Sequence, residues 1–261
     1  MKMLIRGIVG ALAAGTLIFL FGCKKEDAEQ PLGQMTRKNL PLEKVDMNLP
    51  SGTLWANYNL GATAPDEVGD YFAWGEIEPK SYYDWSNYRF GEQYALTKYV
   101  YYNQHFDIVF GKDGYTDDLG VLQKEDDAAA QIWKDNWCTP STADFKELFE
   151  NCNVSWEQYE EDGLVWGLRF RRKNDPDRTL FIPASGSRYI STQYLNVWAQ
   201  CWTSSFDVDN NKSGTPFSAD YFGTNSYYLS YYVKDKLAYY SPYRNGGRNV
   251  GRPIRPCYKP Q

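Results

Sequence analysis

The chain contains a single histidine, His105, and this scarcity excludes any site built from two or more imidazole groups. Basic residues are also in deficit, with 28 Lys and Arg against 33 Asp and Glu. A protein that binds a phosphate backbone usually presents a positively charged face, so the acidic balance argues against nucleic acid as a partner. No motif in the sequence requires a cofactor.

Aromatic residues, in contrast, are abundant. They make up 17% of the 261 residues, while charged residues make up only 23%. Rings that are buried together offset the entropy lost on ordering, so the chain is not a disordered tail. The length allows one large domain or two small ones, each with a real core.

The N-terminus has the pattern of an export signal. Lys2 and Arg6 precede an uncharged run from Ile8 to Gly22, which is shorter than the roughly 20 residues of a membrane-spanning helix. This pattern is typical of a secretory signal peptide. The run ends in Leu20-Phe21-Gly22-Cys23, which resembles a bacterial lipobox, in which the cysteine is acylated and becomes the new N-terminus.

We therefore predict a signal peptide over residues 1–22, lipid attachment at Cys23 and a flexible, proline-containing tether over residues 23–44. An ordinary signal peptide with an incidental cysteine is the alternative. The segment Lys24–Asp27 resembles the export tag of lipoproteins on the outer face of the outer membrane; a solvated charge run would look the same. The expected location is the outer membrane, lipid-anchored and exposed at the cell surface.

The body of the chain reads as one mixed domain. Apolar residues at helical spacing predict a helix around Ala129–Trp133 and a clearer one over Thr142–Cys152, capped by Ser141 with Asp144. Alternating or aromatic-rich runs predict strands. The predicted strands are Gly52–Tyr58, Asp70–Glu76, a hairpin of residues 166–170 with Thr179–Pro183, Val197–Trp202, Tyr227–Val233, Leu237–Tyr240 and an edge or terminal strand over Val250–Pro256.

Ordered landmarks along the body resemble the Fibrobacter succinogenes major paralogous domain family. The landmarks are Leu49–Ala56, Asn59–Thr63, Gly69–Glu76, Glu125–Ala129, Trp137–Pro140, Phe181–Ala184, Trp202–Ser205 and Arg252–Pro256. The resemblance implies an α+β, C-type-lectin-like fold for residues 45–261, with two short helices, a twisted antiparallel sheet and long loops. Members are secreted or lipid-anchored bacterial proteins, and the fold implies adhesion or ligand display.

Four cysteines remain in the body once Cys23 is assigned to lipid. An even number in an oxidising compartment suggests disulfides, and four cysteines allow three pairings. Because C-type-lectin-like folds often tie the first helix to the last strand, the resemblance favours Cys152–Cys257, which leaves Cys138–Cys201. The chain has Cys138 where family members often carry arginine, so the connectivity is not carried over directly, and four buried thiols are the alternative.

The sequence shows no clear catalytic or metal site. Trp202-Thr203-Ser204 stands at the position of the calcium-binding Trp-Asn-Asp strand of true C-type lectins but lacks an adjacent carboxylate. We therefore predict no metal. Glu76 is the best single candidate for an acid in glycan cleavage, and a structural role bonded to backbone amides is the alternative.

The aromatic-rich C-terminal part is the predicted ligand surface. Tyrosine offers a flat apolar face and a hydroxyl at low entropic cost, so binding loops favour Tyr, Ser, Asn and Gly. Half of the strand tyrosines would simply be core, so the loops 203–216 and 242–249 carry more weight. The predicted ligand residues are Trp202, Asp207, Asp209, Asn210, Tyr243, Arg244, Asn245 and Arg248.

The leading functional hypothesis is a non-catalytic, membrane-tethered adhesion module that binds a glycan or a host or surface protein. A structural tip or accessory subunit of a surface assembly is the alternative, and a glycan-active enzyme is a third hypothesis.

Overall fold

The computed structural model describes residues 39–160, 163–190, 192–193, 198–206, 218–225 and 241–260. The chain divides into the units Met1–Arg37 and Lys38–Gln261, and only the second is described below. The predicted signal peptide, Cys23 and most of the predicted tether lie outside the described residues.

In the described ranges, two short helices accompany antiparallel ladders, so the fold class is α+β with mostly antiparallel sheets. The helices are α1 (Ala128–Ile132) and α2 (Thr142–Asn151), and short 3-10 turns span Trp85–Asn87, Lys112–Gly114 and Lys124–Asp126.

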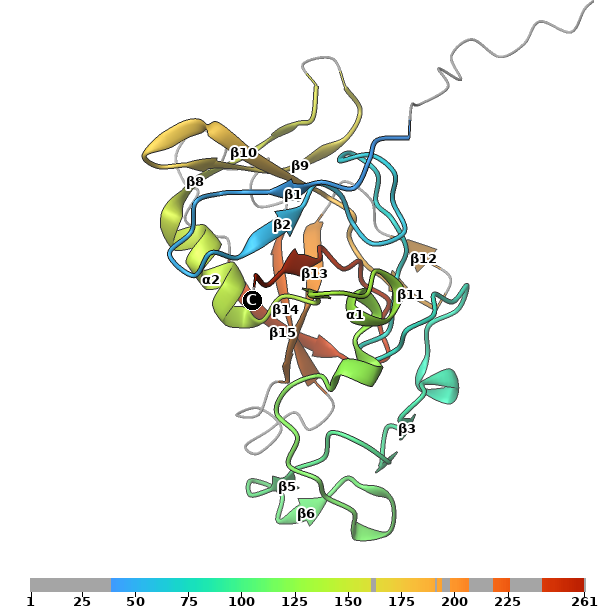
Figure 1. Cartoon of the computed structure of the whole chain (residues 1–261). Helices are drawn as coiled ribbons and strands as arrows, with labels where there is room; N and C mark the ends of the chain where they lie inside the picture. The colour runs from blue at the N-terminus through green and yellow to red at the C-terminus, as the bar shows by residue number, and fades with distance from the viewer. Residues whose placement is uncertain are drawn as a thin grey trace, which may run out of the picture. The chain divides into compact units, whose positions relative to one another are not determined.

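Among the described residues, the strands form three larger sheets and three two-stranded ladders. Figure 1 labels most of these strands. The first has the order β1-β2-β16-β7, with β1 Lys44–Val45, β2 Leu54–Ala56, β16 Cys257–Tyr258 and β7 Trp137–Cys138. The second is β10-β9-β8, with β8 Cys152–Gln158, β9 Trp166–Arg172 and β10 Asp175–Pro183. The third is β13-β14-β15, with β13 Trp198–Phe206, β14 Ser218–Asn225 and β15 Ser241–Gly247. The small ladders are β3 Gly91–Glu92 with β4 Ala95–Leu96, β5 Tyr102–Asn103 with β6 Ile108–Val109, and β11 Arg188–Tyr189 with β12 Thr192–Gln193.

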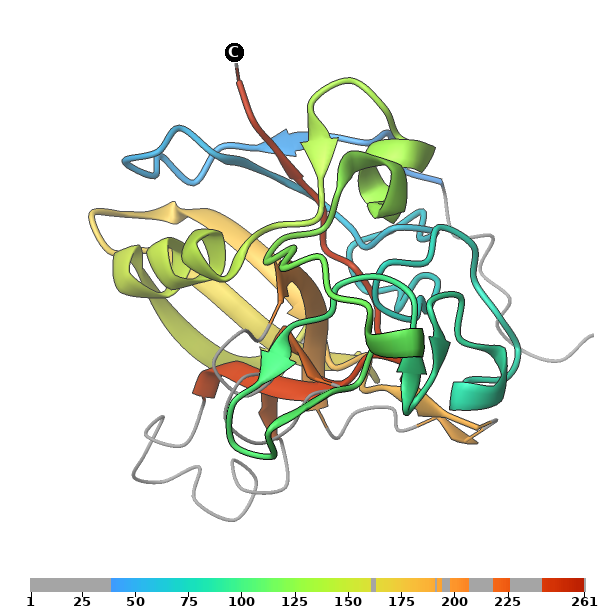
Figure 2. The ribbon, with the colours of Figure 1, turned by 90° about the horizontal axis from the view of Figure 1, so that it is seen from below.

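Helix α2 begins where its cap predicts. The Ser141 hydroxyl accepts from the Asp144 amide while the Asp144 carboxylate accepts from the Ser141 amide, so both form a capping box. Its apolar stripe, Phe145, Leu148 and Phe149, is buried in a core shared with β8, β9 and β10. Figure 2 shows the helix beside the strands of this sheet. This helix and the shorter α1 confirm both helix predictions, except that Cys152 already opens β8.

The hairpin of β9 and β10 is also confirmed. Leu168 pairs with Ile182 and Phe170 with Leu180, and all four side chains are buried. The predicted strands at 52–58 and 197–202 correspond to β2 and β13, whereas those predicted over 227–233 and 237–240 lie outside the described residues.

Two other strand predictions are wrong. Residues 70–76 form only an isolated bridge, in which Phe72 and Arg252 exchange backbone hydrogen bonds, before the chain turns at Gly75 with a φ of 79°. Residues 251–256 do not lie at an edge but run buried through the domain. Their carbonyls accept from distant strands: Pro253 from the Trp202 amide and Pro256 from the Ala56 amide, each at 2.9 Å.

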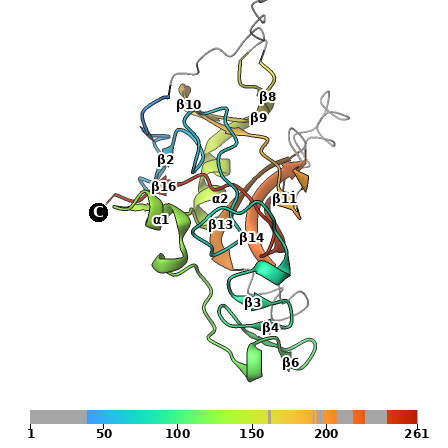
Figure 3. The ribbon, with the colours of Figure 1, turned by 90° about the vertical axis from the view of Figure 1, so that its right-hand side faces the viewer.

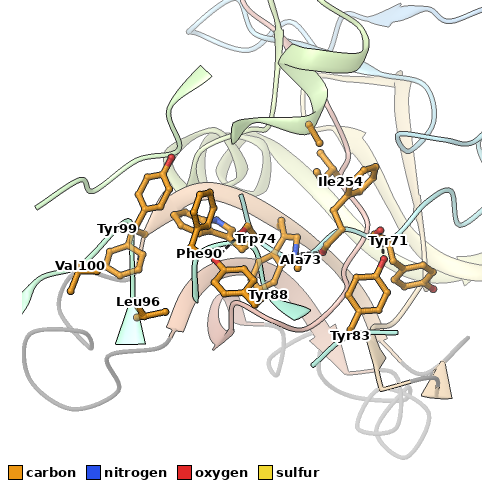
Figure 4. Packing of buried hydrophobic residues seen from close by; sticks show 14 of the residues in the cluster. Tyr71, Ala73, Trp74, Tyr83, Tyr88, Phe90, Leu96, Tyr99, Val100 and Ile254 are labelled. Carbon is orange, nitrogen blue, oxygen red and sulfur yellow. Dashed lines mark hydrogen bonds between the residues drawn. The ribbon is translucent and has the colours of Figure 1, made fainter. Parts of the chain in front are cut away.

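Among the described residues, buried side chains form two clusters, and the second is the core beneath α2 described above. The first is mostly aromatic and gathers residues from 60–110, α1, β13 and Ile254 around Trp74 (Figure 4). Trp74 lies 4.8 Å from Tyr99 and 5.6 Å from Phe206 between ring centroids, and its indole N–H donates to the Thr203 carbonyl at 2.9 Å.

The segment from β3 to β6 lies at the opposite end of this unit from β8, β9 and β10, as two views agree (Figures 1 and 3). It is anchored by Leu96, Tyr99 and Val100, which are buried in the aromatic core. These three buried residues therefore attach the β3–β4 and β5–β6 ladders to the core.

Candidate ligand-binding site

For most of the predicted ligand residues, the structure describes either no atoms or only the backbone. Asp207, Asp209 and Asn210 lie outside the described residues. For Tyr243, Arg244 and Asn245 only the backbone is described, and it forms strand β15 paired with β14 instead of the predicted loop. The register sets Arg244 opposite Tyr221 and Asn245 opposite Asp220, so backbone pairing along β14 replaces the expected free loop.

Trp202 and Arg248 are buried, which corrects their assignment to the ligand surface. The Trp202 indole donates to the Phe72 carbonyl at 2.8 Å, and the Arg252 guanidinium lies 4.4 Å above its ring. Arg248 donates to the Tyr99 carbonyl at 3.2 Å and lies 4.9 Å from the Phe206 ring. Burial lowers the pKa of Arg248. Both side chains thus bind main-chain groups and rings inside the domain.

Glu76 is held by its own neighbours. Its carboxylate accepts from Lys80 Nζ at 2.8 Å and from the Arg89 amide at 2.8 Å, beside a cavity of about 360 Å³. These contacts match the structural role that the sequence analysis set beside the catalytic one. The carboxylate thus binds a lysine and a backbone amide of its own chain.

Exposed rings gather in the segment from β3 to β6, and we call Tyr94, His105 and Phe106 the ring cluster. Phe110 is buried beneath it, with ring centroids 6.1 Å from Tyr94 and 6.5 Å from Phe106. His105 meets Phe106 edge-on at 4.7 Å. Tyr94 is 70% exposed and Phe106 is 50% exposed, although rings of this size are usually buried at least in part.

Local backbone features build the ring cluster. Gly91 has a φ of 97°, and a Cβ there would lie 2.3 Å from the Ala95 carbonyl oxygen, so the tight β3–β4 turn requires glycine. The Leu96 amide donates to the Phe110 carbonyl at 3.0 Å, which holds β4 beside the end of β6. Tyr94, between β3 and β4, is thereby kept near Phe110.

Hydrogen-bonding groups lie next to the rings. The Tyr102 hydroxyl donates to the Asp107 carboxylate, and this bond raises the pKa of Tyr102. The Asn103 side chain accepts from the Phe106 amide at 2.9 Å and fixes the β5–β6 turn. The segment therefore offers apolar faces and polar groups side by side at the surface.

The sequence does contain a signal for the ring cluster. Residues 94–110 hold six aromatic residues besides His105, and turn-forming Asn103 and Asp107 lie among them. The ligand surface was predicted at the C-terminal tyrosines instead, because a sequence pattern does not distinguish exposed rings from buried ones.

A larger cavity of about 510 Å³ lies where residues of β7, α1 and α2 approach Lys259, just after β16. Asp127 in its wall caps α1 and accepts from the Thr139 amide and hydroxyl; burial raises the pKa of Asp127 despite these bonds. Lys259 forms an ion pair with Asp144. These polar groups bind one another, so they brace the wall instead of pointing at a ligand.

All four described cysteines are free thiols. Neither of the bonds that the family resemblance favoured, Cys152–Cys257 and Cys138–Cys201, is present. The close pair is instead Cys138 and Cys257, because strands β7 and β16 are neighbours and set these two residues opposite each other.

Within the described ranges, no group of three or more His, Cys, Asp or Glu side chains could hold a metal ion. Among the same residues, no helix is long and apolar enough to cross a bilayer.

Comparisons of the chain with protein-family models, with curated proteins and with solved structures find no match.

Proposed function

We propose that this chain is a non-catalytic glycan-binding module, anchored by lipid at the outer face of the outer membrane. In this proposal residues 45–261 are a C-type-lectin-like member of the Fibrobacter succinogenes major paralogous domain family. The α+β architecture with two short helices is compatible with that fold. The apolar run ending at Cys23 supports the anchor.

The ring cluster is the observation that carries the binding function. Large exposed apolar surface is costly in water and commonly marks an interaction site. Tyr94 and Phe106 each lie beside the buried ring of Phe110, so each has a partner in the domain before any ligand arrives. A surface ordered in advance loses less conformational entropy on binding than a flexible loop does.

Glycans fit this surface better than an apolar peptide does. A sugar ring has C–H faces bordered by hydroxyl groups, and it needs an aromatic face with hydrogen-bonding groups at its edge. Phe106 supplies such a face in the turn between β5 and β6, next to the Asp107 carboxylate, to which the Tyr102 hydroxyl of β5 donates. An apolar peptide would cover the exposed Asp107 carboxylate and remove its water without offering a donor in return.

The binding proposal is tested on a glycan array of mucin-type and plant-type glycans, with the full chain solubilised in detergent. Phe106→Ala and Tyr94→Ala are each expected to weaken binding of the recognised glycan about tenfold, equal to about 1.4 kcal/mol, because each removes one stacking face.

Tyr189→Ala is the matched control, since Tyr189 is 45% exposed and lies on β11, outside the ring cluster. Its affinity is expected to equal that of the unaltered chain. Absence of glycan binding by a folded chain would contradict the proposal, and co-purification with surface proteins after mild crosslinking would then support the accessory-subunit alternative.

The anchor is tested separately in cells fed a labelled fatty acid. We expect the unaltered chain to incorporate label and Cys23→Ser to incorporate none, because a hydroxyl does not replace the thiol in forming the thioether. Equal labelling of both would show that Cys23 is not the attachment site. Cys201→Ser, a change at a buried position of the domain, serves as the control and is expected to retain the label.

A further inference from the structure

One pair of sulfur atoms meets among the described residues. Cys138 Sγ lies 3.6 Å from Cys257 Sγ, whereas Cys152 and Cys201 are buried without such a neighbour in that part of the chain. Burial raises the pKa of Cys152 to about 11 and that of Cys201 to about 12. These two buried thiols are therefore poor at starting thiol–disulfide exchange with a reagent from solvent.

The backbone holds the close pair together. Strand β7 pairs with β16, and Cys138 and Cys257 are direct partners in this antiparallel register. Strand β16 is also paired on its other side with β2, so its position does not depend on the sulfur contact. The two sulfur atoms need to approach only to the about 2.0 Å of a disulfide bond, without a change in strand pairing.

The two thiols differ in access. Cys138 is partly exposed and lines the cavity of about 510 Å³, while Cys257 is buried behind it. The hydrogen bond with Cys138, together with burial, raises the pKa of Cys257. Lys259 also lines the cavity, and its ammonium group interacts favourably with negative charge on either sulfur. A reagent that enters the cavity therefore meets Cys138 first.

We propose that Cys138 and Cys257 are a modification site at which a disulfide oxidant joins β7 to β16. The Cys138 thiolate attacks one sulfur of the oxidant, forming a mixed disulfide and releasing a thiolate that takes up a proton. Cys257 then loses its proton and attacks Cys138 Sγ, releasing the second oxidant sulfur as a thiol. The protein gives up two electrons and two protons, and the oxidant disulfide becomes two thiols.

This single bond leaves Cys152 and Cys201 as thiols, and it differs from the two bonds that the family resemblance favoured. It rests on the neighbouring strands β7 and β16 and does not depend on the proposed glycan-binding function.

Trypsin digestion places each of the four cysteines in a different peptide, so the proposal can be tested by identifying which peptides are linked. The full chain, purified in reductant, is exchanged into oxidised glutathione, and remaining thiols are alkylated before digestion without reduction. Because trypsin does not cleave before proline, each cysteine of the domain falls in its own peptide. These peptides are Asp135–Lys146 for Cys138, Glu147–Arg169 for Cys152, Tyr189–Lys212 for Cys201 and Asn249–Gln261 for Cys257.

We expect the Cys138 and Cys257 peptides to appear linked, with the Cys152 and Cys201 peptides alkylated. Cys138→Ser is expected to abolish the linked product, and Cys201→Ser to leave its yield unchanged. Linkage of Cys152 to Cys257 or of Cys138 to Cys201 would overturn the proposal. So would recovery of all four peptides in alkylated or glutathione-bound form.

Discussion

Trp74→Ala is expected to lower the free energy of unfolding by about 3–5 kcal/mol, the range found when a large buried aromatic side chain is truncated. The ring is almost fully buried at the centre of the aromatic core, between Tyr99 and Phe206 (Figure 4). Its removal opens a cavity and leaves the Thr203 carbonyl without the indole donor, since that bond is 2.9 Å long in the intact chain. Both losses act in the same direction.

Urea unfolding followed by circular dichroism measures this effect. Trp166→Ala is the control, because Trp166 is partly exposed on β9, and we expect its cost to stay within about 1 kcal/mol. Trp74→Phe keeps a ring but loses the N–H donor, so its stability is expected to fall between the two. If Trp74→Ala unfolded at the same urea concentration as the control, Trp74 would not be the centre of the core.

Arg255→Ala is expected to cost about 2–5 kcal/mol, because it leaves two buried acceptors unpaired. Arg255 is fully buried and donates to the Asn59 side chain at 2.8 Å and to the Ala56 carbonyl at 3.1 Å. Burial lowers the pKa of Arg255 to about 10, which records the cost of keeping this charge away from water. Its hydrogen bonds join the C-terminal segment to the turn after β2.

The matched control is Arg178→Ala. Arg178 also has two partners, Asp46 and Asp175, but all three side chains are partly exposed, and such surface pairs contribute about 0–1 kcal/mol. Thermal unfolding of the two variants against the unaltered chain compares them directly. Similar midpoints for both variants would contradict the structural role assigned to Arg255.

A pH series adds a second readout for Arg255. The pKa of a buried cation is lower in the folded state than in the unfolded state, so its contribution to stability is present above the unfolded value and is lost as pH falls through the folded one. The intact chain is therefore expected to lose stability between about pH 12 and pH 10, relative to Arg255→Ala, as the pH is lowered.

Elements specified by neighbouring residues could be predicted from the sequence. Helix α2 follows from the Ser141–Asp144 cap and the stripe at Phe145, Leu148 and Phe149, all within one segment. The β9–β10 hairpin follows from alternating side chains on either side of a short turn. In both cases the residues that specify the element belong to the element itself or to its immediate flanks.

Elements specified by distant residues could not be predicted. Residues 70–76 have the composition of a strand, but their partner is a single bridge at Arg252, so no ladder extends. Prolines at 253 and 256 suggested an edge, yet each still offers a carbonyl, and Trp202 and Ala56 use these carbonyls from inside the domain. Proline lacks the backbone N–H but keeps the carbonyl, and Pro253 and Pro256 take part in these hydrogen bonds only as acceptors.

The prediction of the ligand-binding residues was wrong at Trp202 for a similar reason. Trp202 and Phe106 are both rings next to polar residues in the sequence, but one is buried and the other half-exposed. Exposure depends on which strands cover each ring, and that is a property of tertiary packing. The ring cluster therefore became apparent only from the structure.

The central place of β16 affects the order in which the domain is completed. This strand fills the gap between β2 and β7 with the last described residues of the chain, and it pairs Cys257 with Trp55 near the start of the domain. Contacts between residues so far apart in sequence form slowly, since a long loop must close before they are made. During vectorial synthesis the sheet stays open until nearly the whole domain has emerged. Under the export that we propose, this delay keeps the chain unfolded enough to pass through a translocation channel.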